Sequence, residues 1–156
     1  TEIPAAAFNG ASKLTSVTIP ASVKTIGVNA FRSSALTTLT VPATIETIGY
    51  GAFRDMASLV DVTFNGENVN IPNYAFRGCA RLETVVVEEG VDYISSYAFG
   101  FTALKSITLP GSLTRINSGL TYPTNATVYY PAGTYVDTYL HSSAARITGE
   151  TLVPIA

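Results

Sequence analysis

The sequence predicts a mostly β solenoid in which about five units of 22–23 residues form a right-handed coil. Three observations predict it. An Ala-Phe pair recurs at a fixed spacing, an alternating apolar segment follows each pair, and 47% of the 156 residues are apolar whereas 13% are charged. Such a composition can bury a core, and a fixed period of about 20–50 residues is typical of stacked repeats. We expect a parallel sheet on one face of the coil and turns or short 3₁₀ pieces on the other.

The Ala-Phe pairs mark the units. They are Ala7-Phe8, Ala30-Phe31, Ala52-Phe53, Ala75-Phe76 and Ala98-Phe99. The spacings between their phenylalanines are 23, 22, 23 and 23 residues, and Ile3 holds the last apolar position of a unit ahead of the first pair. A phenylalanine at one height of every coil predicts a stacked aromatic column inside the solenoid.

A strand is expected after each pair. The pattern Leu-x-x-Val-x-Ile alternates apolar and polar residues, as a half-buried strand does, and its Val, Ile and Thr residues favour a pleated sheet. Pro20, Pro42 and Pro110 end three of these strands, because proline cannot donate to a ladder. The five segments are 14–19, 36–41, 59–64, 82–87 and 104–109. Stacking pairs each strand with the next and buries the apolar face that a single unit leaves exposed.

Residues 117–156 break the period, and we expect them to close the apolar end of the coil, since the terminal units of solenoids are atypical. A strand is expected at 127–131, a short helix at 133–140 and a last strand at 146–148. Tyrosine suits such a cap, because it combines an apolar body with a polar hydroxyl. Five of the nine tyrosines lie here: Tyr122, Tyr129, Tyr130, Tyr135 and Tyr139. The repeats at 3–116 and this cap form one expected domain, 1–156, and a start within a unit suggests a piece of a longer chain.

The repeated unit reads Leu-x-x-Val-x-Ile-Pro, then five residues, then Ile-x-x-x-Ala-Phe. Leu36 to Pro42 and Ile48 to Phe53 show it in full. This unit resembles the BspA-like, or Treponema pallidum type, leucine-rich repeat family, and the resemblance covers roughly residues 3–116. It implies a leucine-rich repeat solenoid. It also implies an extracellular or cell-surface bacterial protein, often from gut or oral bacteria, that binds host proteins, matrix or other cells.

Composition argues against several classes of protein. Nine basic and eleven acidic residues leave a net charge of -2, without the basic excess typical of a nucleic-acid binder. One cysteine excludes an internal disulfide framework, and no apolar run is long enough for membrane insertion. The sequence contains no Gly-x-Ser-x-Gly, His-Glu-x-x-His, P-loop or Rossmann motif. We therefore expect no enzyme, no cofactor and no metal site.

Cys79 and His141 are the single residues of their kinds. Cys79 stands three residues after its phenylalanine, where the other units carry Ala11, Ser34, Met56 and Thr102. A free cysteine at such a position is typically a small core residue. His141 lies in a polar stretch and is expected at the surface.

The first candidate surface for partner binding lies beside the phenylalanines. The residue after the phenylalanine is arginine in three successive units, at Arg32, Arg54 and Arg77. Charges so close need solvent, a neighbouring acid such as Asp55, or an anionic partner. Tyrosines lie in the neighbouring turns at Tyr50, Tyr74, Tyr93 and Tyr97. Arginine beside aromatic residues is typical of interfaces.

The second candidate surface is the outer side of the sheet, which we expect to be a ladder of hydroxyl groups. Its residues are Ser16, Thr18, Thr38, Thr40, Asp61, Thr63, Thr84, Val86, Ser106 and Thr108. Threonine is also a good exposed strand residue, so a purely structural role is the alternative. We favour the arginine side.

These observations predict a non-catalytic recognition or adhesion module that binds a protein, matrix component or glycan at a cell surface. The alternatives are a structural spacer that displays another domain, and a carbohydrate-binding module. Fold alone does not choose among them.

Overall fold

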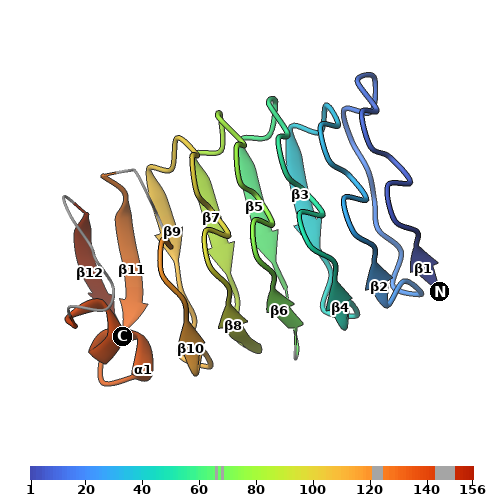
Figure 1. The fold of residues 1–156 in the computed structure, drawn as a ribbon. Coiled ribbons are helices and arrows are strands. Elements are labelled where there is room, and N and C mark those ends of the chain that lie inside the picture. The colour runs from blue at the N-terminus through green and yellow to red at the C-terminus, as the bar shows by residue number, and fades with distance from the viewer. Residues whose placement is uncertain (66, 68, 121–124, 143–149) are drawn as a thin grey trace.

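The computed structural model is a coil of stacked units that runs from the N-terminus at one end to the C-terminus at the other (Figure 1). It describes every residue except 66, 68, 121–124 and 143–149. The leucine-rich repeat solenoid predicted from the sequence is confirmed: almost all regular structure is parallel strand, and the described residues contain one short helix.

A six-stranded parallel sheet covers one face, in the order β12-β11-β9-β7-β5-β3. Its strands are β3 (Thr38–Val41), β5 (Asp61–Phe64), β7 (Thr84–Val87), β9 (Ser106–Thr108), β11 (Thr127–Pro131) and β12 (Thr151–Ile155). Equivalent repeat positions stand opposite one another, so that Leu39 pairs with Val62 and Val62 with Val85. All three side chains are buried, and the repeat period therefore sets both the register and the core.

The first unit has no strand at 14–19, where one was predicted. Its side chains still alternate, with Ile19 buried and Thr18 exposed. Its backbone, however, has a neighbour on one side only, and the second unit reaches it through a single long hydrogen bond here, from Thr37 N–H to the Thr15 carbonyl at 3.3 Å. The prediction was wrong for this end unit, because the few backbone hydrogen bonds that join this segment to the next unit do not form a ladder.

The other face carries short strands that the sequence did not predict. They are β1 (Glu2–Ile3), β2 (Thr25–Ile26), β4 (Thr47–Ile48), β6 (Val69–Ile71), β8 (Val91–Ile94) and β10 (Arg115–Ile116). They form two three-stranded parallel sheets, β1-β2-β4 and β10-β8-β6. The prediction of turns or 3₁₀ pieces alone was incomplete here, because two to four residues are too few to show a strand period. Their β-branched residues suit pairing between coils.

The predicted phenylalanine column is present. Neighbouring rings stack with centroids 5.0–5.8 Å apart and planes within 15°. Phe31, Phe53, Phe76 and Phe99 are fully buried, whereas Phe8 in the end unit is 37% exposed. The first four phenylalanines of the column also donate their backbone N–H to the alanine carbonyl of the next unit, as Phe31 does to Ala52 at 2.7 Å. The Ala-Phe pair thus joins the coils through both side chain and backbone.

Two backbone positions in every unit adopt the left-handed conformation, two residues before and two residues after the phenylalanine. The earlier position holds Ala6, Asn29, Gly51, Tyr74 and Tyr97, and the later one holds Gly10, Ser33, Asp55, Gly78 and Phe101. Their φ angles lie between 53° and 79°. Glycine and asparagine tolerate this conformation well, whereas bulky residues rarely adopt it. The repeat fixes the backbone here but not the residue type.

The C-terminal region extends the large sheet and adds the helix α1 (Tyr135–Leu140). The predicted strand at 127–131 and the predicted helix are confirmed. Thr134 caps α1 and accepts a hydrogen bond from the Asp137 N–H. The predicted strand at 146–148 lies outside the described residues, and β12 was not predicted.

Two tyrosine hydroxyls form hydrogen bonds with backbone groups at the β10 edge of the sheet β10-β8-β6. The Tyr135 hydroxyl accepts a hydrogen bond from the Ile116 N–H, and the Tyr139 hydroxyl donates one to the Asn117 carbonyl. The capping role expected of these tyrosines has a geometric basis, since their hydroxyls bond to backbone groups that a further coil would otherwise meet. Within the described residues, no helix has the length and apolar character of a membrane span.

Candidate partner-binding site

The three arginines occupy equivalent repeat positions but have different surroundings. Arg32 donates from Nε to Asp55 Oδ2 at 3.2 Å, and its Nη2 lies 3.2 Å from the same oxygen. Arg54 Nε also lies 3.2 Å from Asp55 Oδ2, but without hydrogen-bond geometry. Of the outcomes considered for this arginine row, a neighbouring acid is therefore the one realised for Arg32 and Arg54.

Arg77 has no such acid. Among the described residues, no carboxylate pairs with it; instead its guanidinium lies over two rings, 5.4 Å from the Tyr74 centroid and 5.0 Å from the Phe101 centroid. A cation over an aromatic face is attracted by the ring quadrupole. Arg77 is half-buried, so the rings replace part of the water that would otherwise solvate it.

For Arg32 and Arg77, a partner comes from the left-handed position of the next unit. Arg32 meets Asp55, which stands two residues after the following phenylalanine, and Arg77 meets Phe101, which holds the same place one unit further on. For Arg54 that place is Gly78, which has no side chain. Arg54 accordingly approaches Asp55 of its own unit. The residue at this left-handed position thus determines whether the arginine of the preceding unit forms an ion pair or a ring contact.

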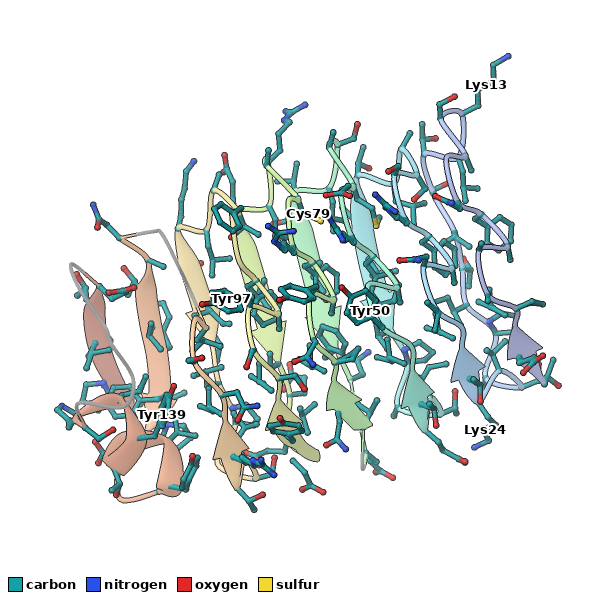
Figure 2. The ribbon with its side chains drawn as sticks, viewed as in Figure 1. Lys13, Lys24, Tyr50, Cys79, Tyr97 and Tyr139 are labelled. Carbon is teal, nitrogen blue, oxygen red and sulfur yellow. The ribbon has the colours of Figure 1, made fainter. Side chains whose placement is uncertain are left out.

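The tyrosines predicted for this side form a continuous row. The Tyr50 and Tyr74 rings meet edge to face at 5.5 Å, and the Tyr74 and Tyr97 rings stack at 6.0 Å with planes 13° apart. Tyr50 and Tyr97 are 45% and 37% exposed. Figure 2 shows these two at a similar height of the coil, on the side that faces the viewer. Large exposed rings in a row are the main apolar surface of this face.

Tyr93 does not belong to this row, although the sequence analysis placed it in the same turns. It lies in β8, and Arg115 of β10 stacks over it with its guanidinium carbon 5.0 Å from the ring centroid. The side chain of Asn117 also donates a hydrogen bond to its hydroxyl. Tyr93 was expected in a turn, but it lies in one of the short strands that the sequence did not predict.

Phe101 is the residue that sequence reasoning missed. It is 48% exposed and, with Tyr74, Arg77 and Tyr97, lines a shallow, open hollow. A signal existed in the repeat: Phe101 stands where the other units carry Gly10, Ser33, Asp55 and Gly78. The significance of that difference emerges only once the left-handed backbone at this position is known.

The outer side of the sheet keeps its predicted composition. One row places Thr38, Asp61, Thr84 and Ser106 opposite one another, and the next places Thr40, Thr63, Val86 and Thr108. All of these residues are exposed or half-exposed. Ser16 and Thr18 are exposed as well but lie in the end unit without a strand. In the two rows, Asp61 is the one charged residue.

Cys79 is buried, as predicted for a core residue. Its Sγ donates to the Phe53 carbonyl at 3.1 Å. Burial raises the pKa of the thiol to about 12, the Met56 backbone hydrogen bond lowers it, and the negative charge of Asp55 raises it further. A thiol with so high a pKa is protonated at neutral pH and is a poor nucleophile.

His141 is exposed, as expected, and its Nδ1 lies 3.0 Å from Asp137 Oδ1 within the same helix end. No group of three or more His, Cys, Asp or Glu residues suited to a metal ion occurs in the described part of the chain.

Comparisons with known proteins agree with this architecture. A leucine-rich repeat protein from Bacteroides ovatus, solved by crystallography, has a TM-score of 0.59 at 23% identity; the match covers 85% of this chain and 41% of that one. A leucine-rich cell surface protein from Faecalibacterium prausnitzii has a TM-score of 0.38 at 17% identity, covering 96% of this chain and 61% of that one. The chain thus spans less than half the length of the first protein. A search of curated proteins finds no match.

The family model for the BspA type leucine-rich repeat region matches residues 1–125 in six copies. This is one copy more than the five units that the Ala-Phe pairs indicate. The match extends over most of the chain and agrees with the repeat, the parallel sheets and the solenoid. The chain belongs to the BspA-type leucine-rich repeat family.

Proposed function

We propose that this chain is a non-catalytic recognition module of the bacterial cell surface, and that a protein partner docks on the side that carries Tyr50, Tyr74, Arg77, Tyr97 and Phe101. We call this set the aromatic strip. Membership of a repeat family whose fold offers an extended surface supports an interaction role. The strip then indicates which part of that surface is used.

The observation that carries the proposal is the exposure of large rings around one arginine. Tyr50, Tyr97 and Phe101 each leave between 37% and 48% of their surface in solvent. Tyrosine and arginine are, with tryptophan, the residues most enriched among the energetically important residues of protein interfaces, and a tyrosine ring buries a large area with few rotatable bonds. The sheet face offers mainly small hydroxyl groups, which gain little on leaving water.

A binding experiment with paired variants tests the proposal. The wild-type chain is immobilised beside a Tyr50→Ser/Tyr97→Ser variant and a Thr40→Ser/Thr63→Ser variant of the sheet face, and each is exposed to host-cell surface extract. We expect saturable binding of a specific protein that the tyrosine variant loses and the threonine variant keeps. The circular dichroism melting curve of each variant verifies that the fold is intact.

Other results would point elsewhere. Binding lost only in the threonine variant would move the site to the sheet. A partner set made up only of glycans would favour the carbohydrate-binding alternative. The absence of any saturable partner, with a second domain in the full-length protein, would favour a spacer.

A further inference from the structure

We infer that the hollow formed by Tyr74, Arg77, Tyr97 and Phe101 binds a carboxylate side chain of an acidic, partly apolar peptide segment in the partner. This inference rests on the proposed function and deepens it. In this proposal Arg77 binds the carboxylate, and the surrounding rings contact the apolar side chains that neighbour it in the peptide.

The first argument is the backbone conformation. Tyr74, Tyr97 and Phe101 all have positive φ, of 57°, 53° and 59°. Most equivalent positions in the other units hold glycine, asparagine, serine or alanine, which are small or tolerate this conformation. All three aromatic residues at left-handed positions line the same hollow. Strained residues gather at ligand-binding sites, where the gain is in binding rather than in folding.

The second argument is the free donor capacity of Arg77. Ring contacts occupy the face of its guanidinium, whereas its N–H donors lie in the guanidinium plane. Within the described residues, no acceptor takes a hydrogen bond from this side chain. A stacked guanidinium is held in a fixed orientation, and its fork matches the two oxygens of a carboxylate.

The third argument is charge. Arg32, Arg54 and Arg77 against the single carboxylate of Asp55 give this group a net charge of +2, although the whole chain carries -2. Asp55 compensates one of the two charges of Arg32 and Arg54, so one of the two remaining positive charges lies at Arg77, with which no carboxylate pairs among the described residues. An anionic group is therefore the complementary ligand.

The rings favour a peptide over a sugar. Tyr74 stacks on Tyr97, and Arg77 lies over Tyr74 and Phe101. The ring faces are thus largely turned toward one another, which removes the open flat platform that a sugar ring needs. Ring edges and a guanidinium fork remain for the ligand, and they suit apolar and acidic side chains.

The test uses the side-chain Nε–H signals of arginine in ¹⁵N NMR spectra of the whole chain. The probe is a blocked peptide of sequence Leu-Glu-Tyr-Glu-Leu, and the control probe has Gln in place of both Glu. Arg115 is an internal control, since it also stacks over a tyrosine, Tyr93, whose backbone has ordinary φ. We expect the Glu peptide to shift the Arg77 signal saturably, with little effect on Arg115, and the Gln peptide to have no effect.

Variants sharpen the test. Arg77→Gln is expected to weaken binding about tenfold or more, the loss typical of one charge-assisted hydrogen bond, and Arg115→Gln is the matched control. Tyr97→Gly removes a ring and relieves the left-handed position. We expect it to weaken peptide binding while leaving the melting temperature unchanged or higher, an outcome that a purely structural role for Tyr97 would not give.

Equal shifts of Arg77 and Arg115 would overturn the inference, because they would indicate nonspecific attraction. No saturable shift of Arg77 would overturn it too. Tighter binding of tri-galacturonate than of the Glu peptide would replace the peptide with an acidic glycan. A protein retained from extract by both wild type and Arg77→Gln would leave the proposed function standing and refute the carboxylate site alone.

Discussion

Arg32 and Arg77 occupy the same place in two repeats and differ in what they contact. Arg32 forms an ion pair with Asp55 of the next unit, and Arg77 lies over Phe101 of the next unit. The first arrangement neutralises charge within the protein. The second leaves the charge of Arg77 available to a partner. The comparison teaches that the repeat fixes where a side chain stands, while one residue in the neighbouring coil decides whether it serves the fold or the surface.

The largest expected effect concerns the phenylalanine column, which supports the units that carry both arginines. Phe53→Ala removes a fully buried ring from the middle of the column and should lower the free energy of unfolding by about 3–5 kcal/mol. Phe8→Ala should cost much less, because that ring is partly exposed and stacks on one side only. Urea denaturation measures both. Equal losses would contradict a column that supports both arginine sites.

Asp55→Asn tests the ion-paired side. Asparagine tolerates the left-handed backbone of this position, so the change removes charge with little strain. Arg32 and Arg54 then lose their carboxylate, and we expect a loss of about 0.5–1 kcal/mol, typical of partly exposed pairs. Thermal melts at low and high salt measure it. The difference from wild type should shrink as salt rises; a salt-independent loss would indicate packing instead.

Phe101→Asp converts the second arrangement into the first. It places a carboxylate where Asp55 stands relative to Arg32, so Arg77 should gain an ion pair and lose its affinity for the acidic peptide. The melting temperature should change little, because an exposed pair contributes little to stability. Peptide titration and melting curves measure the two effects. Unchanged peptide binding would show that Arg77 is not the anion site.

The smallest expected effect concerns the pKa and the reactivity of the Cys79 thiol. Its pKa of about 12 in the folded state lies above the value of 9.0 that an unperturbed cysteine has. The unfolded chain therefore releases the proton first, and this thiol makes stability fall as pH rises from 9 toward 12. Because the thiol of Cys79 is buried and protonated in the folded chain, we expect a reagent to alkylate it only after unfolding. Asp55→Asn removes a charge that raises this pKa and should lower it slightly. Rapid alkylation of the folded wild type at pH 8 would place the thiol at the surface.

The sequence predicted β3, β5, β7, β9 and the phenylalanine column, because each depends on side chains that repeat. Val62 and Phe53, for example, have the same type of residue at the same place in neighbouring units. The left-handed positions were not predictable in this way. Tyr74, Gly51 and Ala6 share a backbone conformation but no chemistry, so their common geometry leaves no residue pattern.

The candidate site was predictable only in part for the same reason. Arg77 and Tyr74 were found from the repeat, since arginine follows three phenylalanines and tyrosines lie nearby. Phe101 was missed, and Asp55 was named as a neighbouring acid for the arginine row without being assigned to a particular arginine. Which of these residues meet is set by contacts between successive coils, and a single sequence does not show how far one coil is offset from the next.

The outer edge of β12 has a consequence for assembly. The Thr151 N–H points inward and bonds to the Ala126 carbonyl; because N–H groups alternate along a parallel strand, the residue at position 154 faces outward. That residue is Pro154, which has no N–H. An open solenoid end invites head-to-tail addition of another copy, a contact that does not close and so grows into filaments. Pro154 leaves one donor fewer on this edge of β12 for pairing with a further strand.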